Sequence, residues 1–134
     1  MKIERLISII LLGLLILPAC KPTLEVRLAS ADEQIPFPRF TVEDPARPGQ
    51  RPLYDTIKLA EAGGQLYWHL RADPFGDQNS VAQFSYAQAI PGFAAVTAPK
   101  PLEANHDYTL AVIGNAYGTI RFRVDSAGKL HLIR

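Results

Sequence analysis

The sequence predicts an all-β protein, and three features of the chain support this. Beyond residue 20, several short segments alternate apolar and polar residues, which is the pattern of strands that bury one face. Turn-forming residues, mainly Gly, Pro, Asp and Asn, separate these segments. No segment after residue 20 repeats its apolar residues with the period of a helix. Short strands of this kind are typical of a small antiparallel β-sandwich or barrel.

Residues 1–19 differ from this pattern and are predicted to form a helical signal peptide. Lys2 and Arg5 precede an apolar core over residues 6–17, which only Ser8 and Gly13 interrupt. Twelve helical residues rise about 18 Å, which is too short for a hydrocarbon core of about 30 Å. We therefore interpret the segment as a secretory signal and not as a membrane span.

The end of this segment, Leu17-Pro18-Ala19-Cys20, resembles the lipobox of bacterial lipoproteins. The resemblance implies cleavage between Ala19 and Cys20, a lipid on the Cys20 thiol, and a tether of residues 20–22 only. Cys20 is the only cysteine of the chain, so no disulfide can form within it. The alternative is an ordinary secreted protein that keeps a free thiol, which is unusual outside the cytosol.

These features predict attachment to a membrane of the bacterial cell envelope. Because Lys21 and not Asp follows the cysteine, the resemblance favours the outer membrane, with the domain facing the periplasm. Removal of 19 of the 134 residues removes two of 14 basic and one of 13 acidic residues, which leaves twelve of each. Such a balanced chain is not expected to bind nucleic acid, which requires clustered basic residues. For the same reason the lipid, and not electrostatic attraction to the bilayer, should supply the membrane attachment.

The folded domain is predicted to span residues 23–134. Its first strand is expected at 23–29, where apolar and polar residues alternate strictly. Residues 36–52 contain five prolines, which remove backbone donors and prevent continuous strand pairing. This Pro-rich segment is expected to be a rigid crossover between sheets that includes one short edge strand at 39–43. The alternative is a loop that binds a partner.

Six further strands are predicted beyond the Pro-rich segment. Gly63 and Gly64 are expected to form the turn of the first hairpin, because glycine adopts positive φ without a steric penalty. Turn residues at 73–77 and 90–93 are expected to interrupt the chain. The strands are expected at 56–60, 65–71, 81–87, 107–113, 118–124 and 129–133.

Two details resemble fibronectin type III and related immunoglobulin-like domains. Leu102 precedes Tyr108 by six residues, as in the tyrosine corner of that family, and Trp68 resembles the buried tryptophan of its B strand. The resemblance covers roughly residues 56–124 and implies an antiparallel immunoglobulin-like β-sandwich with Trp68, Leu102 and Tyr108 in its core. A fold resemblance does not specify an activity.

The chain contains no recognisable catalytic motif, so we expect that it is not an enzyme and has no catalytic residue. His69, His106 and His131 lie in no zinc-binding motif and are expected at the surface. No serine has the setting of a nucleophile elbow, and no glycine-rich segment matches a phosphate-binding loop. We therefore expect no metal and no cofactor.

The sequence accordingly favours a non-catalytic, lipid-anchored protein of the cell envelope that binds another protein or supports an assembly. The alternative is a periplasmic inhibitor or immunity lipoprotein that blocks a hydrolytic toxin. Loops carried on a rigid sandwich are common recognition sites, so the Pro-rich segment and the turn at 73–79 are candidates for the contact. If the contact lies on a sheet face instead, the candidate residues are Tyr67, Arg121 and Arg123, which are expected to point outward.

Overall fold

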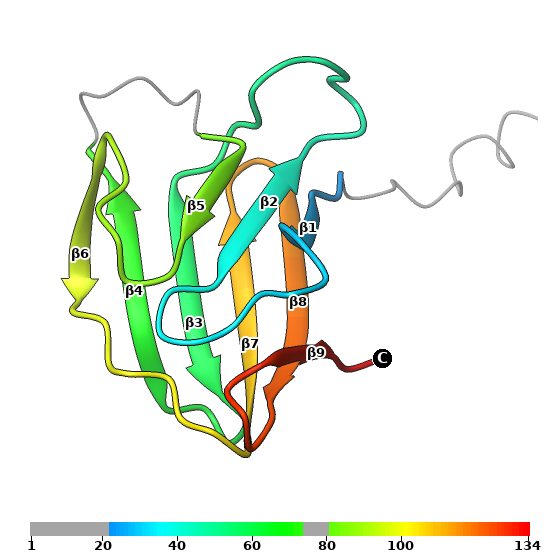
Figure 1. Cartoon of the computed structure of the whole chain (residues 1–134). Coiled ribbons are helices and arrows are strands. Elements are labelled where there is room, and N and C mark those ends of the chain that lie inside the picture. Colours follow the sequence, from blue (N-terminus) through cyan, green and yellow to red (C-terminus); the bar gives the residue numbers. More distant parts are fainter. Residues whose placement is uncertain (1–21, 74–80) are drawn as a thin grey trace, which may run out of the picture.

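The computed structural model describes residues 22–73 and 81–134, which form two antiparallel sheets packed face to face (Figure 1). The predicted signal peptide, its cleavage site at Ala19 and Cys20, and the lipid site at Cys20 lie outside the described residues. Residues 74–79 of the turn expected at 73–79 also lie outside them. The described strands are β1 (Glu25–Leu28), β2 (Arg39–Glu43), β3 (Thr56–Glu61), β4 (Leu66–Ala72), β5 (Gln83–Ser85), β6 (Phe93–Thr97), β7 (His106–Ile113), β8 (Tyr117–Val124) and β9 (Leu130–Leu132).

The two sheets differ in size. The smaller sheet has the strand order β1-β2-β5, and the larger sheet has the order β6-β4-β3-β7-β8-β9. All neighbouring strands in both sheets pair antiparallel. No described residue is helical, and none belongs to a helix able to cross a membrane. The prediction of an all-β chain with antiparallel sheets is therefore confirmed.

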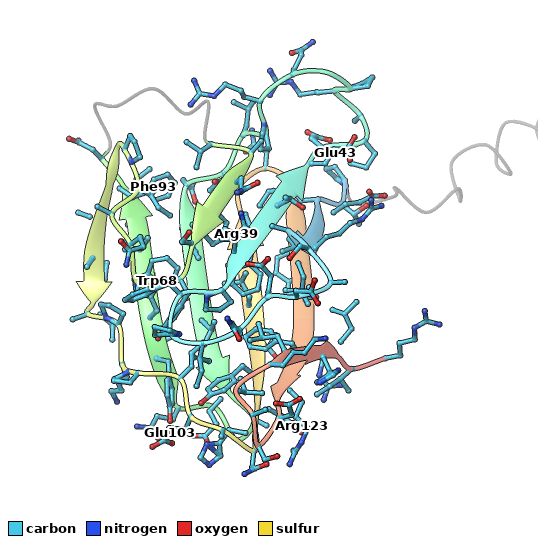
Figure 2. The ribbon with its side chains drawn as sticks, in the orientation of Figure 1. Arg39, Glu43, Trp68, Phe93, Glu103 and Arg123 are labelled. Carbon is cyan, nitrogen blue, oxygen red and sulfur yellow. The ribbon has the colours of Figure 1, made fainter. Side chains whose placement is uncertain are left out.

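Aromatic side chains fill the space between the sheets. The ring of Phe40, on β2, lies 5.8 Å from Phe84 in its own sheet and 5.6 Å from Phe122 in the opposite sheet. Trp68 lies on β4 (Figure 2). Its ring packs edge-on against Tyr86, with 5.1 Å between ring centroids. Trp68, Leu102 and Tyr108, which the sequence assigns to the core, are all buried.

The Pro-rich segment contains the strand that the sequence predicts, but this strand does not lie at the predicted position in the sheet. β2 covers residues 39–43 as expected, and both Phe40 and Val42 point into the core. The strand is not at an edge, however, because it pairs with β1 on one side and β5 on the other. Residues 44–55 then carry the chain from the smaller sheet to the larger one.

Two other strands differ from the prediction. The strand expected at 81–87 shrinks to β5, and Ala82 lies outside it and is exposed. β6 was not predicted, because its residues, Phe-Ala-Ala-Val-Thr, do not alternate in polarity. Pairing with β4 organises β6, and Phe93 packs its ring 5.6 Å from Tyr54. Tertiary pairing therefore creates a strand for which the local sequence carries no signal.

One side of the sandwich is closed by backbone contacts between the sheets. The N–H of Leu24 donates to the carbonyl of Tyr117 at 2.9 Å, at the start of β8. Further along, the N–H of Ile35 donates to Gly128 at 2.9 Å and that of Leu130 to Glu33 at 3.0 Å. The two sheets are therefore tied together where β1 and its following loop meet β8 and β9.

Gly118 allows this close approach. A Cβ atom at position 118 would overlap the carbonyl oxygen of Leu24. Gly118→Ala should therefore lower the free energy of unfolding by about 1–3 kcal/mol, measured by urea denaturation. Thr119→Ala, at the exposed neighbouring position, is the control and should change stability by no more than about 0.5 kcal/mol. Equal stability of the Gly118→Ala protein and the wild type would contradict the close approach.

Candidate functional site

The outward side of the larger sheet carries four basic side chains, Lys58, Arg71, Arg121 and Arg123, which we call the cationic face. Each is exposed and follows or precedes a buried residue of its strand, so all point away from the core. The strand register places Lys58 opposite Ala111, and Ala111 opposite Thr119. Small residues therefore lie between the basic side chains of β3 and β8.

Among the described residues, only one of these four side chains forms an ion pair. Arg123 forms an ion pair of 2.9 Å with Asp107 on β7. In the parts of the chain that the structure describes, no ion pair involves Lys58, Arg71 or Arg121. Asp107 is the only acidic residue on the outward positions of the larger sheet's described strands. The outward strand positions of this face therefore carry an excess of three positive charges, whereas the formal net charge of the whole chain is only +1.

His69 lies within the cationic face, and the positive charges there affect its pKa. It pairs with Lys58 in the register of β3 and β4, and Arg71 follows it by two residues. Burial lowers the pKa of His69, and the charges of Lys58 and Arg71 lower it further. The imidazole is thus kept neutral, so it adds no charge to the face near pH 7.

The structure places Arg121 and Arg123 on the surface but corrects the expectation for Tyr67, which is buried. The register between β3 and β4 shifts here, because Leu59 pairs with Trp68 whereas Ala60 pairs with Leu66. Tyr67 is the extra residue of this β-bulge, and a bulge redirects a side chain that strict alternation would turn outward. It therefore packs on Tyr108 at 5.2 Å and does not belong to any exposed partner surface.

Tyr67 belongs instead to a polar cluster at the end of the sandwich near the β3–β4 turn. Its hydroxyl donates to the carboxylate of Glu103 at 3.3 Å, while the hydroxyl of Tyr108 accepts from the Glu103 N–H at 2.9 Å. The second bond is the tyrosine-corner contact that the sequence predicts. Burial raises the pKa of both tyrosines, so both hydroxyls stay protonated at neutral pH. The cluster fixes the entry to β7 and offers no ionised nucleophile.

The other histidines lie beside carboxylates at the surface. His106 Nδ1 lies 3.2 Å from Glu103, and His131 Nε2 lies 2.7 Å from Asp125. Within residues 22–73 and 81–134, no group of three or more potential ligands is placed to hold a metal ion.

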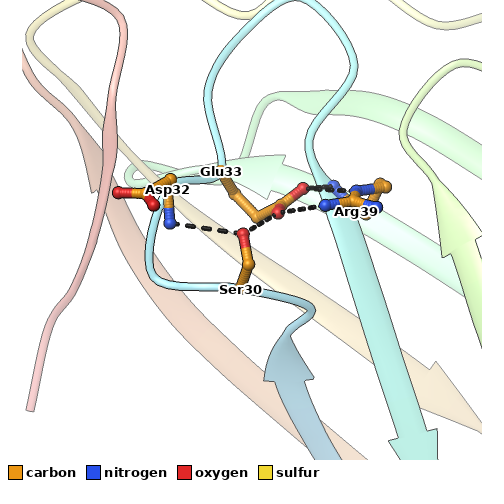
Figure 3. A network of polar contacts seen from close by, with 4 residues as sticks. All are labelled: Ser30, Asp32, Glu33 and Arg39. Atoms are coloured by element: carbon orange, nitrogen blue, oxygen red, sulfur yellow. Dashed lines mark hydrogen bonds and ion pairs between the residues drawn. The ribbon is translucent and has the colours of Figure 1, made fainter.

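A second polar network surrounds the buried carboxylate of Glu33 (Figure 3). Its oxygens accept from the backbone N–H of Arg39 at 2.7 Å and from the guanidinium at 3.1 and 3.0 Å, and Ser30 also donates to them. The hydrogen bond from Arg39 lowers the pKa of Glu33 most strongly, against the opposing effect of burial. Because every contact lies within residues 30–39, the network stabilises the connection between β1 and β2.

A shallow hollow of about 650 Å³ lies beside the cationic face, where β3, β4 and β6 meet. Its wall includes Thr56, Arg71, Ala94 and Val96 and two carboxylates, Asp55 and Asp73. Apart from Arg71, the described wall offers no basic group, and it offers no histidine, serine or cysteine for catalysis.

Comparisons of the chain with family models, with curated proteins and with solved structures gave no match.

The Glu33 network leads to a prediction about acid stability. A carboxylate with a lowered folded pKa stabilises the protein fully above its unfolded pKa of about 4.3, and this stabilisation is lost as the pH falls through the folded pKa. Glu33→Gln should lower the free energy of unfolding by about 1–3 kcal/mol at pH 7, because it removes hydrogen bonds to a charged group. The difference from the wild type should shrink below pH 4.

Urea denaturation between pH 7 and pH 3 measures this difference. The pKa of Asp125 is also lowered, by its bond to His131, but its contribution is present in both proteins and cancels. Asp32→Asn is the matched control, since the Asp32 side chain is 89% exposed and its change should cost no more than about 0.5 kcal/mol. A gap between wild type and Glu33→Gln that stays constant down to pH 3 would refute the role of this charge.

Proposed function

We propose that this protein is a non-catalytic, lipid-anchored domain of the bacterial cell envelope that binds an acidic partner protein through its cationic face. The observation that carries the proposal is the local excess of three positive charges on an otherwise balanced chain. Clustered unpaired charge of one sign raises the association rate with a partner of opposite sign. The alanine and threonine side chains between the basic groups are small, so the surface of another protein can approach the sheet there.

The strand order supports an immunoglobulin-like sandwich as the scaffold. In that family strands A, B and E share one sheet, and strands C′, C, F and G form the other. Here β1-β2-β5 would correspond to the first set and β4-β3-β7-β8 to the second, with β6 and β9 added at the edges. In this correspondence Trp68 would lie on strand C′ and not on strand B, and β2, with Phe40, would take the B position.

The lipid anchor would orient the domain. Residues 23 and 24 lie against Tyr117, and residues 53–55 lie against Gly114 and Ile113 at the same end of the sandwich. A tether of residues 20–22 would therefore hold this end, with the crossover over 44–55, beside the bilayer. This placement disfavours the crossover as the partner contact and leaves the cationic face open at the side.

The anchor is tested by Cys20→Ala, which removes the only thiol of the chain. The protein should move from the membrane fraction to the soluble envelope fraction, because one lipidated residue supplies the whole attachment. Immunoblotting of fractionated cells measures the change, and Ser8→Ala, within the signal core, is the control that should leave the protein in the membrane. Unchanged membrane association of the Cys20→Ala protein would refute lipid anchoring.

Partner binding is tested with a photo-cross-linking residue at position 119, on the β8 side of the cationic face and two residues before Arg121. In living cells it should form an adduct with one envelope protein, identified by mass spectrometry. The same residue at Glu43, exposed on the smaller sheet, is the control and should form no such adduct. Lys58→Glu combined with Arg121→Glu should abolish the adduct.

An adduct that survives the charge reversal would contradict binding through this face. If the partner is a hydrolase whose activity falls when the complex forms, the protein acts as the inhibitor that the sequence left as an alternative.

A further inference from the structure

Tyr117, at the start of β8, is an exposed aromatic residue that contacts the first described residues of the chain. Its side chain is 52% exposed. Its N–H donates to the carbonyl of Pro22 at 3.4 Å, and its carbonyl accepts from the N–H of Leu24 at 2.9 Å. Thr23 pairs with Tyr117 in parallel orientation between these two bonds. The chain therefore enters the domain beside Tyr117.

The length of the tether limits how far Tyr117 can lie from the lipid site. Cys20 precedes Thr23 by three residues, which span at most about 11 Å when fully extended. Paired strands lie about 4.8 Å apart, so the backbone of Tyr117 lies no more than about 16 Å from that of Cys20. A lipid on Cys20 would therefore hold Tyr117 at the membrane surface.

The surface around Tyr117 suits the polar headgroup region of a bilayer. Residues 22–24 and 114–119 contain no charged side chain. Tyrosine combines an apolar ring with a polar hydroxyl, and for this reason it is enriched at the boundary between hydrocarbon and water. Contact with lipid here would cover the ring without removing a charge from water. The exposed neighbours of Tyr117 in these two segments are Pro22, Thr23, Asn115 and Thr119.

Charge at this end of the sandwich favours a zwitterionic bilayer over an anionic one. Basic side chains are outnumbered among the described strand ends and the crossover there, so attraction to anionic headgroups is not expected. Glu25 is moreover paired with Arg27 at 2.7 Å. The acidic residues are Glu25, Glu43, Asp44, Asp55 and Asp73, and the basic ones are Arg27, Arg47 and Arg51.

We propose that Tyr117 is a second membrane contact, which inserts into the headgroup region of a zwitterionic bilayer beside the lipid on Cys20. This inference rests on the proposed lipid anchor and deepens it, because two contacts fix the tilt of a domain that one anchored residue leaves free to rotate. Arg121 and Arg123 follow on the same side of β8, about 13 and 20 Å further along the strand. The cationic face is thereby held clear of the headgroups and stays accessible to a partner.

The tether also distinguishes the bilayer from other occupants of this surface. A lipid headgroup reaches Tyr117 as soon as Cys20 is anchored. A second copy of the chain, or another protein, would have to approach within about 16 Å of the anchored residue, at the membrane surface itself. The bilayer is therefore the occupant that the position of Tyr117 favours.

The test uses the full-length protein, purified from bacterial membranes and reconstituted into phosphatidylcholine vesicles with bromine on the acyl chains next to the headgroup. Bromine quenches tryptophan fluorescence on contact. Tyr117→Trp should lose the emission that the substitution adds, whereas the wild type should keep its emission, because Trp68 is only 2% exposed. Arg121→Trp, on the same side of β8, is the matched control and should lose none.

A second measurement uses the unmodified protein, in case Tyr117→Trp perturbs folding. With a nitroxide on the lipid headgroups, the NMR amide signals of residues 115–118 should be lost, and those of Gly63 and Gly64, at the opposite end of the sandwich, should remain. Tyr117→Ser should reduce this difference between the two ends, because only the lipid then orients the domain. Leu132→Ser removes another exposed apolar side chain, which is 59% exposed, and should leave the difference unchanged.

Three results would overturn the inference. Equal quenching of Tyr117→Trp and Arg121→Trp would place the cationic face on the membrane. Stronger quenching after addition of phosphatidylglycerol would show a contact driven by anionic lipid. Protection of Tyr117→Trp from iodide without quenching by brominated lipid would show that a protein covers the site.

Failure of the inference can be separated from failure of the proposed anchor. If Cys20→Ala leaves the protein in the membrane fraction, the proposed anchor is wrong. If Cys20→Ala releases the protein and Tyr117→Trp is nevertheless not quenched in the anchored protein, only the second contact is wrong.

Discussion

The packing of aromatic rings between the sheets is the constraint on which the rest of the structure depends. The ring of Phe84 lies between those of Trp68 and Phe40, Phe40 also packs on Phe122 of the opposite sheet, and all four rings are buried. Buried tyrosines at its margin must also satisfy their hydroxyl groups. Tyr54 donates to the carbonyl of Val81 at 2.6 Å, and Tyr86 donates to the carbonyl of Lys100. The core therefore positions loops as well as strands, because each of these tyrosine hydroxyls binds the backbone of a connecting segment.

The charge distribution on the outside follows from the same constraint. The apolar residues of the larger sheet's strands point inward. The small and basic residues that alternate with them therefore point outward. The bulge at Tyr67 interrupts this rule once, and it adds a further aromatic ring to the core at the expense of the surface. What remains outside is a face of mainly small and basic residues, with one large exposed ring, Tyr117, at the start of β8. Binding there depends on electrostatic attraction, which favours rapid and selective association over a large hydrophobic contribution.

The sandwich is asymmetric from side to side. Backbone bonds from Leu24, Ile35 and Leu130 close the side at β1, β8 and β9, whereas on the opposite side β6 extends beyond the cover of the smaller sheet (Figure 1). A three-stranded sheet cannot cover a six-stranded one, so some inward-facing surface of the larger sheet must stay exposed. Part of that surface lies at β6, where Ala94, Ala95 and Val96 are exposed.

The sequence by itself determined the all-β class, the strands with clear alternation, the Gly63-Gly64 turn and the burial of Trp68, Leu102 and Tyr108. These features depend on local periodicity, turn chemistry and residue size, all of which can be recognised in short segments. It also identified Arg121 and Arg123 as outward residues, which is half of the cationic face. Only the tertiary structure added Lys58 and Arg71, because the grouping of β3, β4 and β8 side chains depends on strand order. It also decided the burial of Tyr67 and the existence of β6. A bulge and an edge strand depend on pairing with distant segments, and the local pattern of residues does not indicate that pairing.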